Sequence, residues 1–105
     1  MTAVFKALSD PTRRRVLELL REGPRGAGEL AAEFPVSKPT MSAHFAVLRE
    51  AGLVSSHKEG KAVVYTLELS VLEEALLGFA EAFGWTLQGA QRARGGRAPR
   101  QVPGR

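Results

Sequence analysis

Small polar and basic side chains cluster between residues 37 and 44 of this 105-residue chain. They are Ser37, Lys38, Thr40, Ser42 and His44. Hydroxyl groups donate and accept hydrogen bonds, a lysine ammonium pairs with phosphate oxygens, and an imidazole ring can do either. Such groups in close succession favour contact with the phosphates and base edges of a nucleic acid. The chain has none of the cysteine nucleophiles, glycine-rich phosphate loops or Ser/His/Asp groupings that would point to catalysis.

A single helix is expected to carry this cluster, capped by Ser37 at its start and by Gly52 after its end at Ala51. Three apolar residues at i, i+4 and i+7 are expected to face the core, namely Met41, Phe45 and Leu48. Small and polar residues then point outward, where a backbone can approach a major groove closely. The predicted DNA contacts on this helix are Ser37, Lys38, Pro39, Thr40, Ser42, Ala43 and His44. Capping is the favoured role for Ser37 and DNA contact for Thr40 and Ser42, while His44 is either a phosphate contact or an ordinary surface histidine.

A β-hairpin is predicted to follow, because two β-prone runs at 53–58 and 62–67 flank a glycine turn. Lys58, Gly60 and Lys61 at its tip are the second group of predicted DNA contacts, beside phosphates or in a minor groove. The alternative is a solvated turn with no partner. Helices are also expected at 2–9, from Asp10-Pro11 to Gly23-Pro24, at 27–34 and at 70–86. This order predicts a mostly α fold with a small β-hairpin, a winged helix-turn-helix.

Several motifs occur in a fixed order along about residues 3–85. They are Ser-Asp-Pro-Thr-Arg at 9–13, Leu-Ala at 30–31, Val-Ser at 36–37, Thr-Met-Ser at 40–42, His-Phe at 44–45, Leu-Arg at 48–49, Ala-Gly-Leu-Val at 51–54 and Gly-Lys-Ala-Val-Val-Tyr-Thr-Leu at 60–67. Together they resemble the ArsR/SmtB family of bacterial repressors. The segments 4–13 and 36–39 are most similar to its metal-independent, SdpR-like autorepressors. The resemblance implies a transcriptional repressor that acts on its own promoter.

A homodimer is expected, because one recognition helix reads only a few base pairs whereas a two-fold dimer reads a palindromic operator in double-stranded DNA. The first and last helices are predicted to form an isologous interface. Its residues are Val4, Phe5, Leu8, Leu72, Leu76, Phe79 and Phe83. The alternative is that Leu76 and Phe79 belong to the core of one chain, and the sequence leaves open which stripe of the last helix faces outward.

Charge is distributed unevenly along the chain. Residues 1–87 carry ten Lys/Arg against eleven Asp/Glu, a balance of −1, and 88–105 carry five Arg and no acid. The expected domains are therefore a winged-helix DNA-binding and dimerisation domain at 1–87 and a disordered Arg/Gly/Pro-rich tail at 88–105. The tail is a phosphate-binding arm, an anchor for an acidic partner or a mere compositional extension. The run Arg13-Arg14-Arg15 is expected to be solvated or paired with Glu18 and Glu22.

No metal or other cofactor is predicted. The chain has no cysteine, its two histidines are His44 and His57, and the last helix contains neither histidine nor aspartate. The adjacent Glu73 and Glu74 are expected to diverge on their helix. No secretory signal or membrane-spanning run is evident, so a cytoplasmic location is expected.

The prediction is a homodimeric, sequence-specific DNA-binding regulator that represses its own promoter and is not an enzyme. The alternative is a winged-helix module that contacts proteins and does not read bases, and the near-neutral balance of 1–87 favours it to some degree. The operator, the regulated genes and the effector or partner protein that relieves repression are not determined by the sequence.

Overall fold

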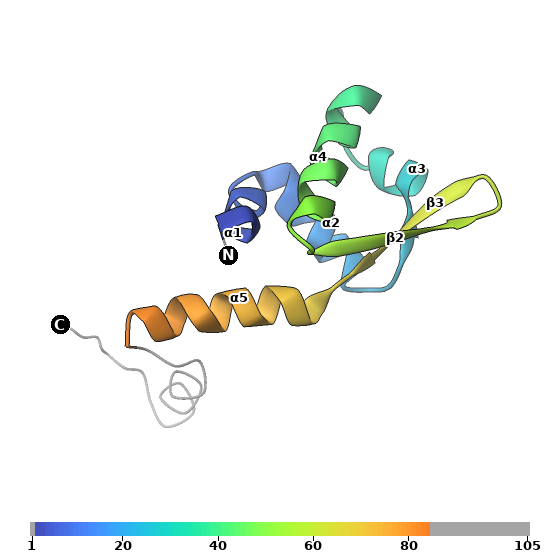
Figure 1. Cartoon of the computed structure of the whole chain (residues 1–105). Coiled ribbons are helices and arrows are strands. Elements are labelled where there is room, and N and C mark those ends of the chain that lie inside the picture. The colour runs from blue at the N-terminus through green and yellow to red at the C-terminus, as the bar shows by residue number, and fades with distance from the viewer. Residues whose placement is uncertain (1, 85–105) are drawn as a thin grey trace. The chain divides into compact units, whose positions relative to one another are not determined.

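The computed structural model describes residues 2–84. Its elements are α1 (Thr2–Leu8), α2 (Pro11–Leu20), β1 (Arg25–Gly26), α3 (Ala27–Ala31), α4 (Lys38–Glu50), β2 (Val54–Glu59), β3 (Ala62–Leu67) and α5 (Leu69–Ala82). Figure 1 shows the short helices α1 and α3 on either side of α4, with the hairpin of β2 and β3 extending beyond α3. The predicted mostly α fold with a small β-hairpin is confirmed. The chain divides into a unit that reaches Leu72 and a second that begins at Glu73, so α5 is shared between them.

Local capping rules explain where α2 and α4 begin. The Asp10 carboxylate accepts a hydrogen bond from the backbone N–H of Arg13 at 3.1 Å, and Pro11 occupies the first turn of α2. In the same way, Ser37 Oγ accepts from the backbone N–H of Thr40 at 3.2 Å. The predicted capping roles of Asp10 and Ser37 are therefore confirmed, and α4 ends before Gly52, which has a φ of 77°.

The arginine run at the start of α2 was only partly predicted. Arg15 pairs with Glu18 at 3.1 Å, as expected. Arg14 instead donates to the carbonyl oxygen of Leu8 at 2.8 Å, and Arg13 donates to carbonyl oxygens of α1. The expectation of solvation holds for Arg14, which stays exposed, and is wrong for Arg13, because the last carbonyls of a helix lack intrahelical donors and attract nearby cations.

The sheet contains one strand more than predicted. Its order is β1-β3-β2, all antiparallel, and β1 pairs Arg25 with Tyr65 and Gly26 with Val64. The hairpin is closed by Gly60 and Lys61, with Glu59 opposite Ala62 and a φ of 63° at Gly60. A two-residue loop of this kind needs a positive φ, which glycine adopts without strain.

The largest differences from the predicted helix ends are in α3 and α5, whereas α1 and α4 each end one residue early. The helix expected at 27–34 ends at Ala31 and continues as turns before Pro35. Helix α5 begins at Leu69 and ends at Ala82 rather than at 86. The tail at 88–105 and the predicted domain boundary at 87 lie outside the described residues.

The core of the first unit lies between the helices and the sheet. Its largest fully buried side chains are Leu30, Met41, Leu48, Leu53 and Val16. These residues come from α2, α3, α4 and the start of the hairpin, so burying them fixes α4 against α2, α3 and the sheet. The helix that carries the polar cluster is therefore anchored along its whole apolar side.

Candidate nucleic-acid interface

The beginning of α4 exposes most of the predicted contact residues. Those exposed to solvent are Ser37, Lys38, Pro39, Thr40, Ser42 and Ala43. Ser37 Oγ also donates to Thr40 Oγ1 at 3.0 Å, so these two hydroxyls are held together at the helix start. The outward face combines hydroxyls, one lysine and small side chains, which lets the helix backbone come close to a groove.

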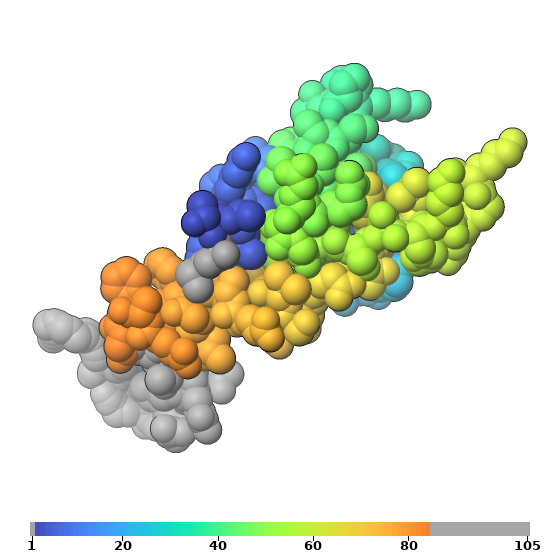
Figure 2. Space-filling model, in the orientation of Figure 1, coloured from blue at the N-terminus to red at the C-terminus, as the bar shows by residue number. Residues whose placement is uncertain are grey.

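The hairpin tip provides a second group of exposed polar residues. Lys58 and Lys61 are exposed, and within residues 2–84 neither side chain has a hydrogen bond or ion pair. The acidic residue at the tip, Glu59, pairs with His57 at 2.9 Å. Figure 2 shows the start of α4 and the hairpin tip as separate protrusions of the surface. Two unpaired ammonium groups on a protruding turn are suited to phosphate oxygens.

A hollow of about 440 Å³ lies between α3, α4 and β3. Lys38, Ser42 and Arg49 line its α4 side. Arg49 donates from Nη1 to Tyr65 Oη at 3.4 Å, and the Tyr65 ring stacks on Phe45 with centroids 4.7 Å apart. This edge of α4 therefore places two cations, Lys38 and Arg49, at a hollow that the rings of Phe45 and Tyr65 also line.

Arg49 was not among the predicted contacts, although a signal was present. Lys38, Ser42 and Arg49 are spaced at i, i+4 and i+11, which places them along one edge of a helix. Helical geometry applied to the charged residues alone would have grouped Arg49 with Lys38. We therefore add Arg49 to the candidate interface.

His44 lies on the opposite edge of α4, turned toward the start of α2. Its side chain is 16% exposed and its Nδ1 lies 3.1 Å from Arg13 Nη1. The structure does not bring His44 together with Lys38 and Ser42 at the hollow. Its predicted phosphate contact stays a prediction, and Arg13, which the prediction left out of the site, is its neighbour.

The predicted dimer residues differ in burial. Val4 is buried within this chain, which leaves little of its side chain for a partner. Phe5, Leu8 and Leu72 are half-buried. The remaining three are exposed, namely Leu76, Phe79 and Phe83. The ring of Phe79 on α5 and that of Phe83, just after the helix, have centroids 5.1 Å apart.

Neither a metal cluster nor a membrane span is found in the described part of the chain. No group of three or more His, Cys, Asp or Glu side chains within residues 2–84 is placed to hold a metal ion. None of the helices in that range is long and apolar enough to cross a bilayer.

Helix α3, a turn, α4 and the β2–β3 hairpin follow one another in the order of a winged helix-turn-helix, which is the fold class of this protein. Comparison with known proteins agrees: residues 10–56 match the family described as "Bacterial regulatory protein, arsR family". A solved structure titled as an ArsR family transcriptional regulator, RHA00566, aligns with a TM-score of 0.73 at 32% identity, covering 79% of this chain and 91% of that one.

Two curated relatives extend the match. The chain is 43% identical over 76 residues to the transcriptional repressor SdpR of Bacillus subtilis (strain 168), covering 72% of this chain and 84% of the relative. It is 45% identical over 64 residues to the HTH-type transcriptional regulator Rv2034 of Mycobacterium tuberculosis (strain ATCC 25618 / H37Rv), covering 61% and 60%. The chain belongs to the ArsR family of bacterial regulatory proteins, a family of transcription regulators and not of enzymes.

Proposed function

We propose that this chain is a homodimeric repressor that binds a palindromic operator in double-stranded DNA, at its own promoter in the cytoplasm, and that needs no metal ion. The observation that carries the proposal is the division of α4 into two sides. Its apolar residues are buried, whereas Lys38, Thr40, Ser42 and Ala43 are exposed beside a hairpin tip with two unpaired lysines.

In this proposal α4 enters the major groove and the hairpin contacts the flanking backbone. Thr40 and Ser42 contact base edges or nearby phosphates, and Lys38 reaches a base or a phosphate. Lys58 and Lys61 flank Gly60 and pair with phosphates beside the groove. Bound across a promoter, such a protein would occlude RNA polymerase and so repress transcription.

Dimerisation is inferred from the exposed apolar residues of α5 together with the symmetry of operators. Leu76, Phe79 and Phe83 are large apolar side chains left exposed in the single chain. An isologous interface would bury them, and a two-fold dimer would present two α4 helices to the two half-sites of a palindromic operator. Phe5, Leu8 and Leu72 complete the proposed interface.

Metal independence is supported by the donor set. The chain has no cysteine, and its histidines lie on α4 and β2 with Arg13 and Glu59 as neighbours. Imidazole and thiolate ligands must converge to bind zinc or similar ions. Zinc is therefore expected to leave the melting temperature unchanged, and a large stabilisation would contradict this part of the proposal.

The test is a fluorescence anisotropy titration near physiological salt with the duplex upstream of the protein's own gene and a scrambled duplex. We expect the upstream duplex to bind about a thousandfold more tightly. Equal, weak binding to both duplexes would contradict autoregulation. It would favour the protein-contact alternative, for which the balance of −1 over residues 1–87 is the supporting observation.

A further inference from the structure

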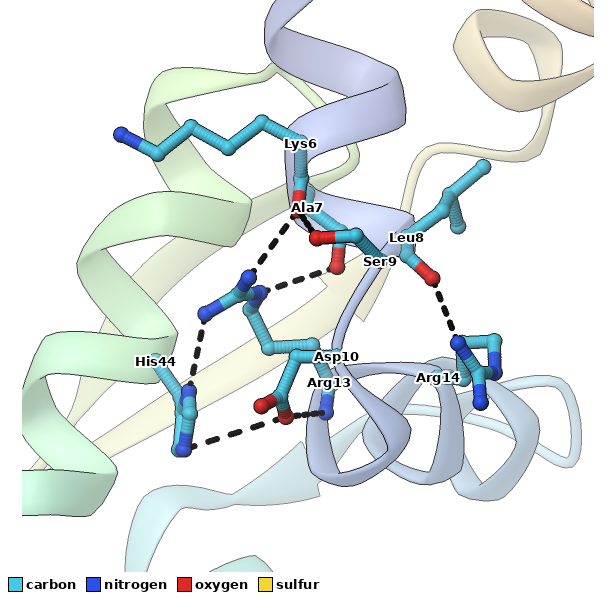
Figure 3. A network of polar contacts seen from close by, with 8 residues as sticks. All are labelled: Lys6, Ala7, Leu8, Ser9, Asp10, Arg13, Arg14 and His44. Atoms are coloured by element: carbon cyan, nitrogen blue, oxygen red, sulfur yellow. Dashed lines mark hydrogen bonds and ion pairs between the residues drawn. The ribbon is translucent and has the colours of Figure 1, made fainter.

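Arg13 is bonded to two helices besides its own. Its Nε donates to the carbonyl oxygen of Ala7 at 2.9 Å and its Nη2 to that of Lys6 at 3.0 Å, both near the end of α1. Its Nη1 lies 3.1 Å from His44 Nδ1 on α4. Figure 3 shows the guanidinium between the end of α1 and the His44 ring. One side chain thus joins the predicted interface helix α1 to the predicted recognition helix α4.

The chemistry of the pair determines the protonation state of His44. A guanidinium is always charged and has only donors, so His44 Nδ1 has to be the acceptor. A hydrogen bond between these two atoms thus requires the ring form that carries its proton on Nε2 alone. That nitrogen lies 3.9 Å from Asp10 Oδ2, which suits an N–H directed toward a carboxylate without a close hydrogen bond. Because the His44 side chain is only 16% exposed, water does not readily replace either neighbour.

Protonation of His44 would exchange one contact for the other. A proton on Nδ1 would face Arg13 Nη1, so two donors and two positive charges would meet across the 3.1 Å contact. The charged ring would then be attracted to Asp10. Desolvation acts to raise the pKa of Asp10, but the backbone N–H of Arg13 and a charged His44 outweigh it and hold that pKa below its usual value. Asp10 thus stays ionised throughout the pH range in which imidazole titrates.

Among the described residues, two charged groups lie against the His44 ring. Arg13 and Asp10 come from the start of α2, and Lys6 comes from α1 with its side chain extending away from the ring. The two that face the ring have opposite effects: Arg13 requires the neutral form, whereas Asp10 favours the charged form. Protonation would therefore break the contact through which Arg13 links α4 to the carbonyl oxygens of α1, and would favour the contact between His44 and Asp10.

We propose that Arg13 is a positioning residue for α4, and that its bond to neutral His44 makes operator binding fall as the pH is lowered through the range in which imidazole is protonated. This inference rests on the proposed DNA-binding function, because α4 carries the predicted contacts. A recognition helix reads base edges only in the correct orientation, so loss of the Arg13–His44 contact, one of several contacts that position α4, is expected to weaken specific binding more than non-specific binding.

The first test uses the full chain and the upstream duplex, with the scrambled duplex as reference, from about pH 8 to about pH 5.5. We expect the ratio of specific to non-specific affinity to fall at least about fivefold over this range. His44→Asn keeps an acceptor at the position of Nδ1 but does not titrate, so its ratio is expected to stay constant. His57→Asn, which removes the other histidine, is expected to keep the wild-type pH profile. A His44→Asn profile identical to that of the wild type would overturn the proposal.

A second measurement separates this inference from the proposed function. Imidazole ¹⁵N chemical shifts of the free protein at about pH 8 report which nitrogen carries the proton. We expect the Nε2–H tautomer for His44, with its shifts changed by Arg13→Gln and unchanged by Arg14→Gln, which removes only the neighbouring bond to Leu8. An Nδ1–H tautomer would overturn the proposal whether or not DNA binds. If Arg13→Gln does not fold, the wild-type tautomer and the His44→Asn profile still decide.

Discussion

Helices α4 and α5 are both amphipathic, but only one of them has its apolar side covered by the described chain. Met41, Phe45 and Leu48 on α4 are 1%, 6% and 0% exposed. On α5, four large side chains are exposed: Leu69 by 50%, Leu76 by 40%, Leu77 by 40% and Phe79 by 48%, and Phe83 just after its end is exposed by 75%. A contiguous set of exposed apolar side chains is typical of an interaction surface. The contrast agrees with the proposal that α4 turns its polar side toward DNA and that α5 contributes an apolar surface to a dimer.

The largest expected effect comes from changing the proposed α5 interface. Leu76→Glu with Phe79→Glu would place two carboxylates in an isologous apolar contact and so convert a dimer into monomers. A monomer keeps only one half-site, so operator affinity is expected to fall by about a thousandfold. Sedimentation and anisotropy measure the two effects.

Leu77→Glu is the matched control for that change. Leu77 is as exposed as Leu76, but it lies about 100° away around the helix, outside the stripe of Leu72, Leu76, Phe79 and Phe83. We expect it to leave the dimer and the operator affinity unchanged. Dissociation by Leu77→Glu but not by the double variant would show that the other stripe of α5 forms the interface.

Helices α4 and α5 are also expected to differ in how much a Leu→Ala substitution changes the free energy of unfolding. Leu48→Ala removes a fully buried side chain and is expected to lower the free energy of unfolding by about 3 kcal/mol. Leu77→Ala removes an exposed side chain and is expected to change it by about 0.5 kcal/mol or less. Urea unfolding at one fixed protein concentration measures both, since the stability of a dimer depends on concentration. Equal losses would mean that Leu77 is covered in the native assembly.

The contribution of the lysines on α4 and at the hairpin tip to DNA binding is tested by its salt dependence. Lys38→Gln and Lys61→Gln are each expected to weaken operator binding about tenfold and to reduce the slope of log K against log salt by about one. Lys6→Gln, which changes a lysine on α1, is the control and is expected to leave the slope unchanged. An unchanged slope for Lys38→Gln and Lys61→Gln would remove these two lysines from the interface.

The weakest of these effects is expected from the cap at the start of α2, where Asp10 accepts a hydrogen bond from the backbone N–H of Arg13. Asp10→Ala removes the helix cap and is expected to lower the free energy of unfolding by about 1 kcal/mol at neutral pH. Because the pKa of Asp10 is lowered in the fold, its stabilisation is present above the unfolded value of about 4 and is lost as the pH falls through the lower folded value. The difference between Asp10→Ala and the wild type should therefore shrink below about pH 4. Asp10→Asn keeps a capping oxygen without titrating, so its own stability should show no such loss.

Local rules were enough to predict much of this fold. The caps at Asp10 and Ser37, the apolar spacing of α4 and the glycine turn of the hairpin depend on neighbouring residues, and all are present. Strand β1 was missed because its two residues pair with β3 across about 40 positions, as Arg25 does with Tyr65. No short-range pattern encodes such a pairing.

The candidate site was predictable on one edge of α4 and not on the other. Exposure of Lys38 and Ser42 follows from helical spacing alone. The bond between Arg13 and His44 joins residues 31 apart, and the carbonyls that Arg13 also binds lie six and seven positions away. Those contacts depend on how α1, α2 and α4 pack, so the sequence could identify His44 as a candidate but could not identify its partner.

In the proposed function, the hydroxyls of Thr40 and Ser42 on α4 contribute to base recognition. The most direct measurement is the ratio of upstream to scrambled duplex affinity for Thr40→Ala with Ser42→Ala, beside Thr2→Ala with Ser70→Ala as a matched removal of two hydroxyls elsewhere. We predict that the first pair lowers the ratio by about tenfold or more with little change in scrambled binding, and that the second pair leaves it unchanged. A ratio unaffected by the first pair, with helix content preserved, would contradict base recognition by Thr40 and Ser42.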